Sequence, residues 1–157
     1  MDRLDDAQVI DSWRVNAAAW AGAVRREEIE SRKLVTDAAV VHAALERAPR
    51  KVLDLGCGEG WLSRRLAQAG CDVVGVDGIA ALIDEARSAG GATYEVATYE
   101  QLAERDFAPR FDLVVANFSL IGAEAVDGVV GRVPRWLVPG GALVIQTVHP
   151  LVATGDQ

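Results

Sequence analysis

The run from Val52 to Gly60, VLDLGCGEG, most constrains what this chain can fold into. Residues typical of a buried strand lead into glycines at every second position, Gly56, Gly58 and Gly60. Because glycine has no Cβ, the backbone of such a turn can approach a bound molecule closely. The helix expected next offers free N–H groups and the positive end of its dipole. The run therefore predicts the nucleotide-facing turn of an α/β domain.

Composition and charge narrow the class of protein. The 157 residues suffice for one domain, predicted over 1–157, and 50% of them are hydrophobic, enough for a sizeable core. The net charge of −7 argues against a non-specific nucleic-acid or membrane-surface binder. No apolar run approaches the roughly 20 residues of a membrane span. The acidic start, MDRLDD, shows no signal peptide, so we expect a cytoplasmic protein.

The two cysteines give no indication of a metal site. Cys57 and Cys71 lack the spacing of metal ligands, and both are expected to lie in the core as free thiols.

The chain after residue 50 alternates between strand-like and helix-like segments. Apolar strands are predicted at 51–55, 72–76, 92–96, 111–116 and 142–148. Helices are predicted at 61–69, 80–88, 98–105 and 123–137, and a Pro-Gly-Gly turn at 139–141. Such alternation predicts a doubly wound, Rossmann-like α/β fold, with helices on both faces of a mainly parallel sheet in the order 3-2-1-4-5. The crevice is then expected at the carboxyl ends of strands 1 and 4.

The N-terminal part is expected to be helical. The first 31 residues would form a segment of their own, followed by the Rossmann-like core at 32–157. Trp13 and Trp20 stand seven positions apart, which places them on one helical face. That face packs either as ordinary core or over a bound molecule as a lid. A second, amphipathic helix is expected from Leu34 to Leu45.

Details of the glycine turn bear on the class of nucleotide. A dinucleotide fold has G-x-G-x-x-G, whose third small residue lets the helix pack against the strand. Here the third glycine comes one position early, and Trp61 stands where the small residue is needed. Asp54 would repel a pyrophosphate but attract an ammonium group. Asp77, which ends the run VVGVD, can accept bonds from ribose hydroxyls in either class. The turn therefore favours a nucleotide with a cationic amino-acid end.

Four runs together carry a resemblance to a known family: VLDLGCGEG, VVGVD, FDLVVANFSL and LVPGGALVIQTVHP. In order and spacing, from Val52 to Pro150, they resemble the motifs of the class I S-adenosylmethionine-dependent methyltransferases. The N-terminal pattern W-x-x-N-A-x-x-W is similar to bacterial small-molecule members of that class. The resemblance implies S-adenosylmethionine as cofactor and methyl transfer to an oxygen or nitrogen atom of a small molecule, without nucleic-acid or membrane partners.

The resemblance also implies which residues hold the cofactor. They are Arg32, Asp54, Gly56, Cys57, Gly58, Asp77, Gly78, Ile79, Leu82, Thr98, Tyr99, Asn117 and Phe118. In the methionine portion, Asp54 would lie near the amino group, partly through water, and Arg32 near the carboxylate. Asp77 would hold the ribose. Asn117 and Phe118 would face the methionine portion and the methyl acceptor.

Several of these residues also have a purely structural interpretation. Thr98 departs from the acid that is usual at its position in the family, and it fits the capping box Thr98-x-x-Gln101. Asp77 is suited to capping a helix, and Arg32 to the surface. His149 ends the fifth strand near the crevice, where its pKa suits a general base, although a structural role stays open. The run NFSL lacks the Pro-Pro-aromatic pattern of relatives that methylate exocyclic nitrogens.

The fifth strand raises a question of completeness. Full class I domains add two strands after it, whereas this chain ends at LVATGDQ, soon after Pro150. An exposed apolar edge favours aggregation, so we expect missing residues or a second copy in a homodimer to cover it. The alternatives to an enzyme of this class are a non-catalytic module that binds S-adenosylmethionine or S-adenosylhomocysteine and an NAD-dependent oxidoreductase. Trp61 and Asp54 disfavour the oxidoreductase.

Overall fold

A computed structural model describes residues 5–26, 30–105 and 110–148 of the chain. Five parallel strands in these ranges form one sheet in the order β3-β2-β1-β4-β5. The strands are β1 (Lys51–Leu55), β2 (Asp72–Asp77), β3 (Thr93–Val96), β4 (Phe111–Asn117) and β5 (Leu137–Gln146). The doubly wound order predicted from the alternation of strands and helices is confirmed.

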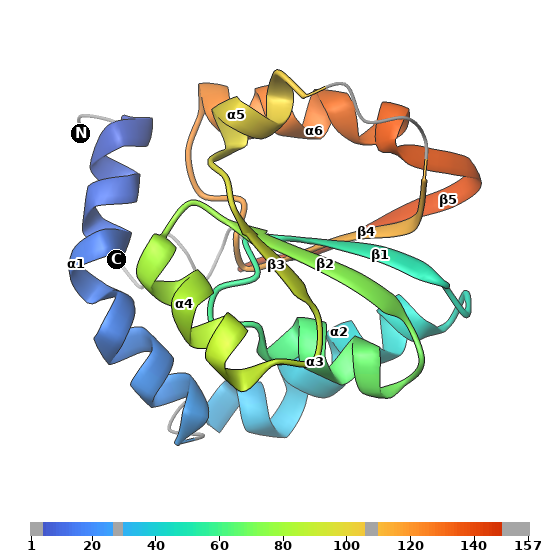
Figure 1. Cartoon of the computed structure of the whole chain (residues 1–157), viewed down its shortest axis with the longest axis horizontal. Coiled ribbons are helices and arrows are strands. Elements are labelled where there is room, and N and C mark those ends of the chain that lie inside the picture. Colours follow the sequence, from blue (N-terminus) through green and yellow to red (C-terminus); the bar gives the residue numbers. More distant parts are fainter. Residues whose placement is uncertain (1–4, 27–29, 106–109, 149–157) are drawn as a thin grey trace, which may run out of the picture.

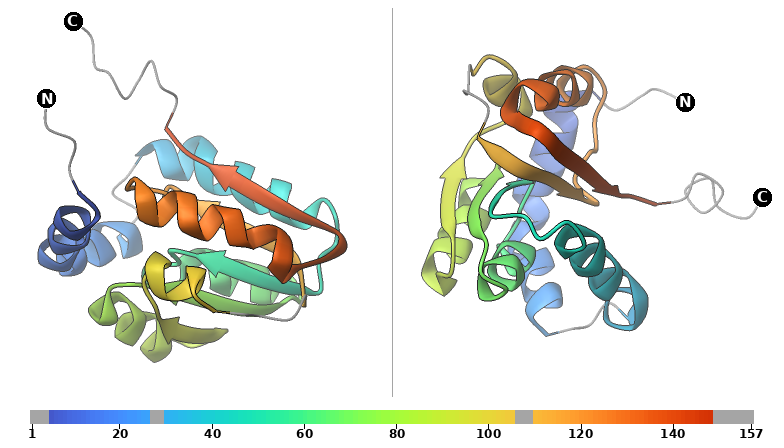
Figure 2. Two further views of the ribbon diagram at one scale, coloured as in Figure 1. Left: turned by 90° about the horizontal axis from the view of Figure 1, so that it is seen from above. Right: turned by 90° about the vertical axis from the view of Figure 1, so that its right-hand side faces the viewer.

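Helices cover both faces of the sheet (Figure 1). They are α1 (Asp6–Arg25), α2 (Asp37–Leu45), α3 (Trp61–Gln68), α4 (Ala80–Ala89), α5 (Tyr99–Ala103) and α6 (Glu124–Trp136), and a π-helical stretch, η1 (Arg32–Thr36), leads into α2. α5 and α6 lie on one face, while α2 and α3 lie on the other (Figures 1 and 2). α1 runs beside the sheet, so its inner face is available to the strand ends.

Alternation along the strands builds one core on each face. Leu53 and Leu55 of β1 pack toward α5 and α6, together with the fully buried Trp136. Val52 packs toward α2 and α3. Successive side chains of a strand point to opposite faces, so the apolar run of β1 supplies both cores. The same alternation directs Asp54 to the α3 face of the sheet.

Capping chemistry sets the start of two helices. The Thr98 hydroxyl accepts a hydrogen bond from the Gln101 N–H, and the Gln101 side chain accepts one from the Thr98 N–H. The predicted capping box is therefore confirmed, although α5 ends at Ala103, two residues before the predicted end. A second capping box, formed by Asp5 and Gln8, starts α1 and was not identified from the sequence.

The prediction of a turn at 139–141 was wrong. β5 begins at Leu137, directly after α6, and is already paired with β4 there. Residues 138–141 then leave the ladder, and pairing resumes at Ala142. Gly140 in this stretch has φ +82°. Glycines that permit a tight turn permit a bulge equally well, so the Pro-Gly-Gly signal did not distinguish the two.

The two cysteines differ in burial. Cys57 is buried, whereas Cys71 is only partly buried, because it lies in the loop between α3 and β2. This corrects the expectation that both thiols lie in the core. Within the described ranges, no group of histidine, cysteine, aspartate and glutamate side chains is arranged to hold a metal ion. None of the helices in those ranges is long and apolar enough to cross a bilayer.

Candidate functional site

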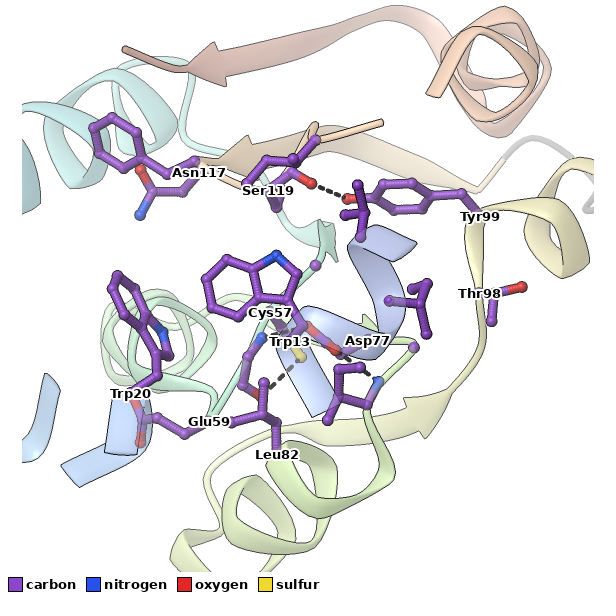
Figure 3. A pocket seen from close by; sticks show the side chains of 18 of the residues that line it. Trp13, Trp20, Cys57, Glu59, Asp77, Leu82, Thr98, Tyr99, Asn117 and Ser119 are labelled. Atoms are coloured by element: carbon purple, nitrogen blue, oxygen red, sulfur yellow. Dashed lines mark hydrogen bonds between the residues drawn. The ribbon is translucent and has the colours of Figure 1, made fainter. Parts of the chain in front are cut away.

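The carboxyl ends of β1, β2 and β4 border a cavity of about 140 Å³ against the inner face of α1 (Figure 3). Twelve of the thirteen residues predicted to bind a cofactor line it: Arg32, Gly56, Cys57, Gly58, Asp77, Gly78, Ile79, Leu82, Thr98, Tyr99, Asn117 and Phe118. Parallel strands bring their carboxyl ends to one edge of the sheet, so residues far apart in the sequence meet there.

The glycine turn after β1 shapes one wall of the cavity. Gly56 and Gly58 have φ values of +67° and +57°. A Cβ on Gly56 would lie 2.3 Å from the Ser119 Cβ, whereas a Cβ on Gly58 would meet nothing within 4 Å. The Ser119 hydroxyl is itself fixed, since it donates to the Leu55 carbonyl at 2.6 Å. Gly56 is therefore required by close packing, and Gly58 leaves open space for a ligand.

Asp77 joins the turns that follow β1 and β2. Its Oδ2 accepts a hydrogen bond from the Gly58 N–H and its Oδ1 one from the Ile79 N–H, both at 2.9 Å. Burial raises the pKa of the Asp77 carboxyl, and these two bonds act in the opposite direction. A carboxylate offers about four lone-pair sites, so lone pairs are left for ligand hydroxyls. Holding the start of α4 and binding a ligand are therefore compatible.

Asp54 is the predicted residue that does not line the cavity. It is 1% exposed, and its carboxyl accepts a hydrogen bond from the Ser63 hydroxyl at 2.6 Å, on the α3 face of the sheet. Burial raises the pKa of the Asp54 carboxyl to about 7; the bond from Ser63 opposes this, and the charge of Asp77 adds to it. The strand alternation that turns Asp54 toward α3 keeps its carboxyl away from the cavity.

Glu59 lines the cavity and was not identified from the sequence. Its side chain is 1% exposed. Its Oε2 accepts a hydrogen bond from Arg64 Nη2 at 2.7 Å and lies 4.0 Å from Nε of Arg25. Its Oε1 is buried and has no hydrogen-bond partner among the described residues. The run GCGEG shows an acid in the turn, but its burial depends on α1 and α3 and has no signal in the sequence.

Arg32 and Trp61 meet where η1 approaches α3. The Arg32 guanidinium lies over the Trp61 indole, 4.7 Å from the ring centroid, and Nε of Arg32 donates to Asp37 at 3.0 Å. The Arg32 side chain is only 11% exposed, so the interpretation as a surface arginine does not hold. Trp61 stands where dinucleotide folds have a small residue. Here its indole holds the Arg32 cation at the cavity.

The aromatic face of α1 borders the cavity. Trp13 and Trp20 contact each other edge to face, with ring centroids 5.4 Å apart, and both line the cavity. Their predicted position on one helical face is confirmed. The same helix packs on Ile79 and Leu82 of the α4 region through Ala17 and Ala21. Ala17 and Ala21 are small, so the two segments can approach closely.

Polar contacts fix α1 at both of its ends. The Asp6 carboxylate accepts hydrogen bonds from the N–H groups of Ala123, at 2.7 Å, and Ala125, at 2.9 Å, at the start of α6. These bonds lower the pKa of the Asp6 carboxyl. At the other end, Arg25 pairs with Glu85 of α4. The helix therefore spans the cavity from α6 to α4.

The loops after β3 and β4 close the remaining side. The Tyr99 hydroxyl donates to the Ser119 carbonyl at 2.9 Å, and burial raises the pKa of this phenol. Phe118 adopts φ +52°, a strained conformation of the kind that clusters at functional sites. Asn117 Oδ1 and Oε1 of Gln146, its paired residue in β5, are buried without hydrogen-bond partners in the part of the chain that the structure describes.

One predicted residue is not described by the structure, and further residues line the cavity that were not predicted. His149, the predicted general base, lies outside the described residues. Lining residues that the sequence did not single out for this site are Asp6, Val9, Ile10, Val24, Glu59, Trp61, Ala97, Glu100, Ser119, Ile121 and Ala125. Most come from α1 or follow a predicted residue in a strand-end loop, and the α1 set depends on how that helix packs.

This chain is similar in sequence to proteins of known family. Residues 52–141 match the sequence model of a family described as a methyltransferase domain. A ubiquinone biosynthesis O-methyltransferase of Pseudomonas aeruginosa is 35% identical over 107 residues, which cover 65% of this chain and 46% of that protein. A malonyl-[acyl-carrier protein] O-methyltransferase of Enterobacter lignolyticus is 34% identical over 98 residues, covering 62% of this chain and 39% of that protein.

A solved structure gives the same result at the level of the fold. The TehB-like SAM-dependent methyltransferase of Corynebacterium glutamicum superposes with a TM-score of 0.66 at 28% identity, covering 83% of this chain and 72% of that one. The chain spans less than half of the length of the two O-methyltransferases, 46% and 39%. Since the family match covers more than half of the chain, the chain belongs to the methyltransferase-domain family, and its fold is that of the class I S-adenosylmethionine-dependent methyltransferases.

Proposed function

We propose that this chain transfers the methyl group of S-adenosylmethionine to an oxygen or nitrogen atom of a small molecule. The observation that carries the proposal is the cavity in which twelve predicted residues meet, most of them from the ends of separate strands. The two similar enzymes are named as O-methyltransferases, which favours an oxygen acceptor.

The polar groups of the cavity fit this cofactor. Asp77 retains lone pairs for two ribose hydroxyls, and Ile79 and Leu82 offer apolar surface to an adenine ring. Arg32, held over Trp61, offers a cation to a carboxylate. The open space beside Gly58 lets a ligand lie against the backbone. We therefore assign the nucleoside to the side of β2 and α4, and the amino-acid portion to the side of η1 and α3.

The mechanism follows from what these residues can do. S-adenosylmethionine supplies a methyl group on a cationic sulfur, which leaves as a neutral thioether. The protein therefore needs to align the reactants and exclude water, and alignment of this kind contributes roughly 7–11 kcal/mol. Trp13, Trp20 and Phe118 exclude water from the cavity, and the Asn117 amide orients the acceptor. We propose His149 as general base for acceptors that must lose a proton.

The surroundings of the cavity support two further parts of this proposal. α1 acts as a lid, because it is held at α6 by Asp6 and at α4 by Arg25 while its aromatic face borders the cavity. The β5 edge pairs only with β4 in the described sheet, and Ile145 is 47% exposed beside it. We propose that a second copy of the chain, or additional residues, cover this edge, and that the protein works in the cytoplasm.

The experiment is a transfer assay with labelled cofactor. The chain is incubated with S-adenosylmethionine labelled in its methyl group and with a pool of small metabolites, and products are sought by mass spectrometry. Label in a metabolite, absent with Asp77→Ala, supports the proposal. Cofactor binding without transfer to any pool supports the non-catalytic binding module instead. Binding of NAD without binding of S-adenosylmethionine overturns the cofactor assignment.

A further inference from the structure

Glu59 is a carboxylate that the fold buries at the cavity and holds in one orientation. It lines the cavity beside Trp20, on the side opposite Thr98 and Tyr99 (Figure 3). Arg64 fixes it twice, since Nη2 of Arg64 donates to Oε2 at 2.7 Å and Nη1 donates to the Glu59 carbonyl at 2.6 Å. The side chain therefore has little freedom to seek other partners.

The second oxygen of this carboxylate is left without a donor. Oε1 is buried, and the described residues provide no hydrogen bond to it. Nε of Arg25 is 4.0 Å from Oε2, too far for a hydrogen bond. A buried acceptor without a donor costs free energy, so native proteins rarely retain one unless a ligand or water completes it. The arrangement is suited to a cationic donor that enters from the cavity.

Asp54, the acid expected near the cofactor's amino group, is not placed for that role. Its carboxyl is engaged by the Ser63 hydroxyl on the α3 face, and it does not line the cavity. Glu59 does line it, together with Arg32. A buried carboxylate and a largely buried guanidinium at one cavity match the two charges of an amino acid, because an ammonium only donates hydrogen bonds and a carboxylate only accepts them.

We infer that Glu59 binds the amino group of the methionine portion of the cofactor through Oε1, and that it thereby determines preference for ligands with a free amino group. The inference rests on S-adenosylmethionine being the cofactor of this cavity. It assigns the amino end to the turn between β1 and α3 rather than to the acid within β1.

The test compares two ligands that differ only in the amino group. S-adenosylhomocysteine and its deaminated analogue are titrated calorimetrically into the wild-type chain, Glu59→Gln and Glu85→Gln. Glu85 is the matched control, because it also pairs with Arg25 but does not line the cavity. We expect the wild type and Glu85→Gln to bind S-adenosylhomocysteine about tenfold more tightly than the analogue, as a charge-assisted bond implies. We expect Glu59→Gln to lose most of this preference.

The other outcomes are equally informative. Equal weakening of both ligands by Glu59→Gln would show that Glu59 only supports the turn or α1, and would overturn the inference. An unchanged preference in Glu59→Gln would overturn it as well. A wild type that binds neither ligand would reject the cofactor assignment, which separates that failure from one specific to Glu59.

A second variant keeps the test valid if Glu59→Gln unfolds. Glu59→Asp retains the charge but withdraws it by one methylene, so we expect it to reduce the preference for the amino group to less than that of the wild type. Thermal unfolding of each variant is measured beforehand. A Glu59→Asp protein that folds and keeps the full preference would contradict a direct bond from Oε1.

Discussion

The two ends of the cavity differ in how fully the protein satisfies its own polar groups. At the end near β2 and α5, both oxygens of Asp77 accept backbone N–H groups, Thr98 completes a capping box, and the Tyr99 hydroxyl donates to a backbone carbonyl. At the other end, Glu59 and Asn117 each carry a buried oxygen without a partner in the described ranges. We infer that one end is formed before the ligand arrives, and that the ligand completes the other.

This difference matches the chemistry of a methyl donor. The nucleoside part does not react, and a preformed site binds it with a smaller entropic cost. The sulfonium and the acceptor react, and groups that gain their bonds only on binding can place them relative to each other.

The largest effect is expected at Gly56. In Gly56→Ala the new Cβ lies 2.3 Å from the Ser119 Cβ at a backbone φ of +67°. We expect the free energy of unfolding to fall by about 3 kcal/mol, since overpacking adds to backbone strain. In Gly58→Ala the Cβ meets nothing within 4 Å, so strain alone should cost about 1 kcal/mol. Urea denaturation measures both, and equal losses would contradict the close packing at Gly56.

The next effect concerns the preformed end. Asp77→Asn replaces one carboxylate oxygen with an amide NH2 group, which cannot accept the N–H that this oxygen accepts from Gly58 or from Ile79. We expect the affinity for S-adenosylhomocysteine to fall about 100-fold, as the loss of one bond to a charged group implies. Calorimetry measures the change. An affinity within a factor of two of the wild type would show that Asp77 does not shape the nucleoside site.

Asp54 predicts a dependence of stability on pH. Its pKa is about 7 in the folded chain, against an ordinary 3.8, so the folded state holds this proton more tightly than the unfolded state. The stabilisation is full below about pH 4 and is lost as the pH rises through 7. We expect the wild type to lose about 2 kcal/mol between about pH 4 and 5.5 relative to Asp54→Asn, whose amide does not titrate. Urea denaturation at each pH measures the free energy of unfolding of both proteins. If it changed by the same amount in the wild type and in Asp54→Asn, the burial of the acid would be contradicted.

The smallest effect is expected at the end of α1. Asp6→Ala removes the acceptor of the Ala123 and Ala125 N–H groups, so α1 should leave the cavity more often. We expect bound S-adenosylhomocysteine to dissociate faster by less than tenfold, since exposed polar contacts are individually weak. Asp11→Ala is the control, because Asp11 is exposed and pairs with Arg14 of the same helix. Stopped-flow dissociation that is equal in both variants would argue against a lid.

Sequence reasoning located the parts of the site that strand ends determine. Gly56, Gly58 and Asp77 follow apolar strands directly, and parallel strands bring such residues to one edge whatever the rest of the fold does. Asp54 was expected at the cavity, but it lies within β1, where side chains alternate between the two faces of the sheet. Its carboxyl therefore points to α3 rather than to the strand ends. Glu59 was missed because its burial depends partly on α1, which packs beside the turn from a distant part of the chain. The spacing of residues around Glu59 does not predict such a contact.

The N-terminal helix shows the same limit. The spacing of Trp13 and Trp20 fixed their common face, but not whether that face would pack as core or border a ligand cavity. The choice depends on Asp6 meeting α6 and on Arg25 meeting α4, contacts between segments about 60 or more residues apart. At 139–141, glycine freedom was identified correctly, and only the pairing with β4 decided between a turn and a bulge.

The central claim is that this cavity binds S-adenosylmethionine rather than a dinucleotide. Calorimetric titration of the chain with S-adenosylmethionine, S-adenosylhomocysteine and NAD tests it most directly. We predict one site for each of the first two ligands, abolished in Asp77→Ala, and no binding of NAD. Binding of NAD together with no heat from either S-adenosyl compound would contradict the account.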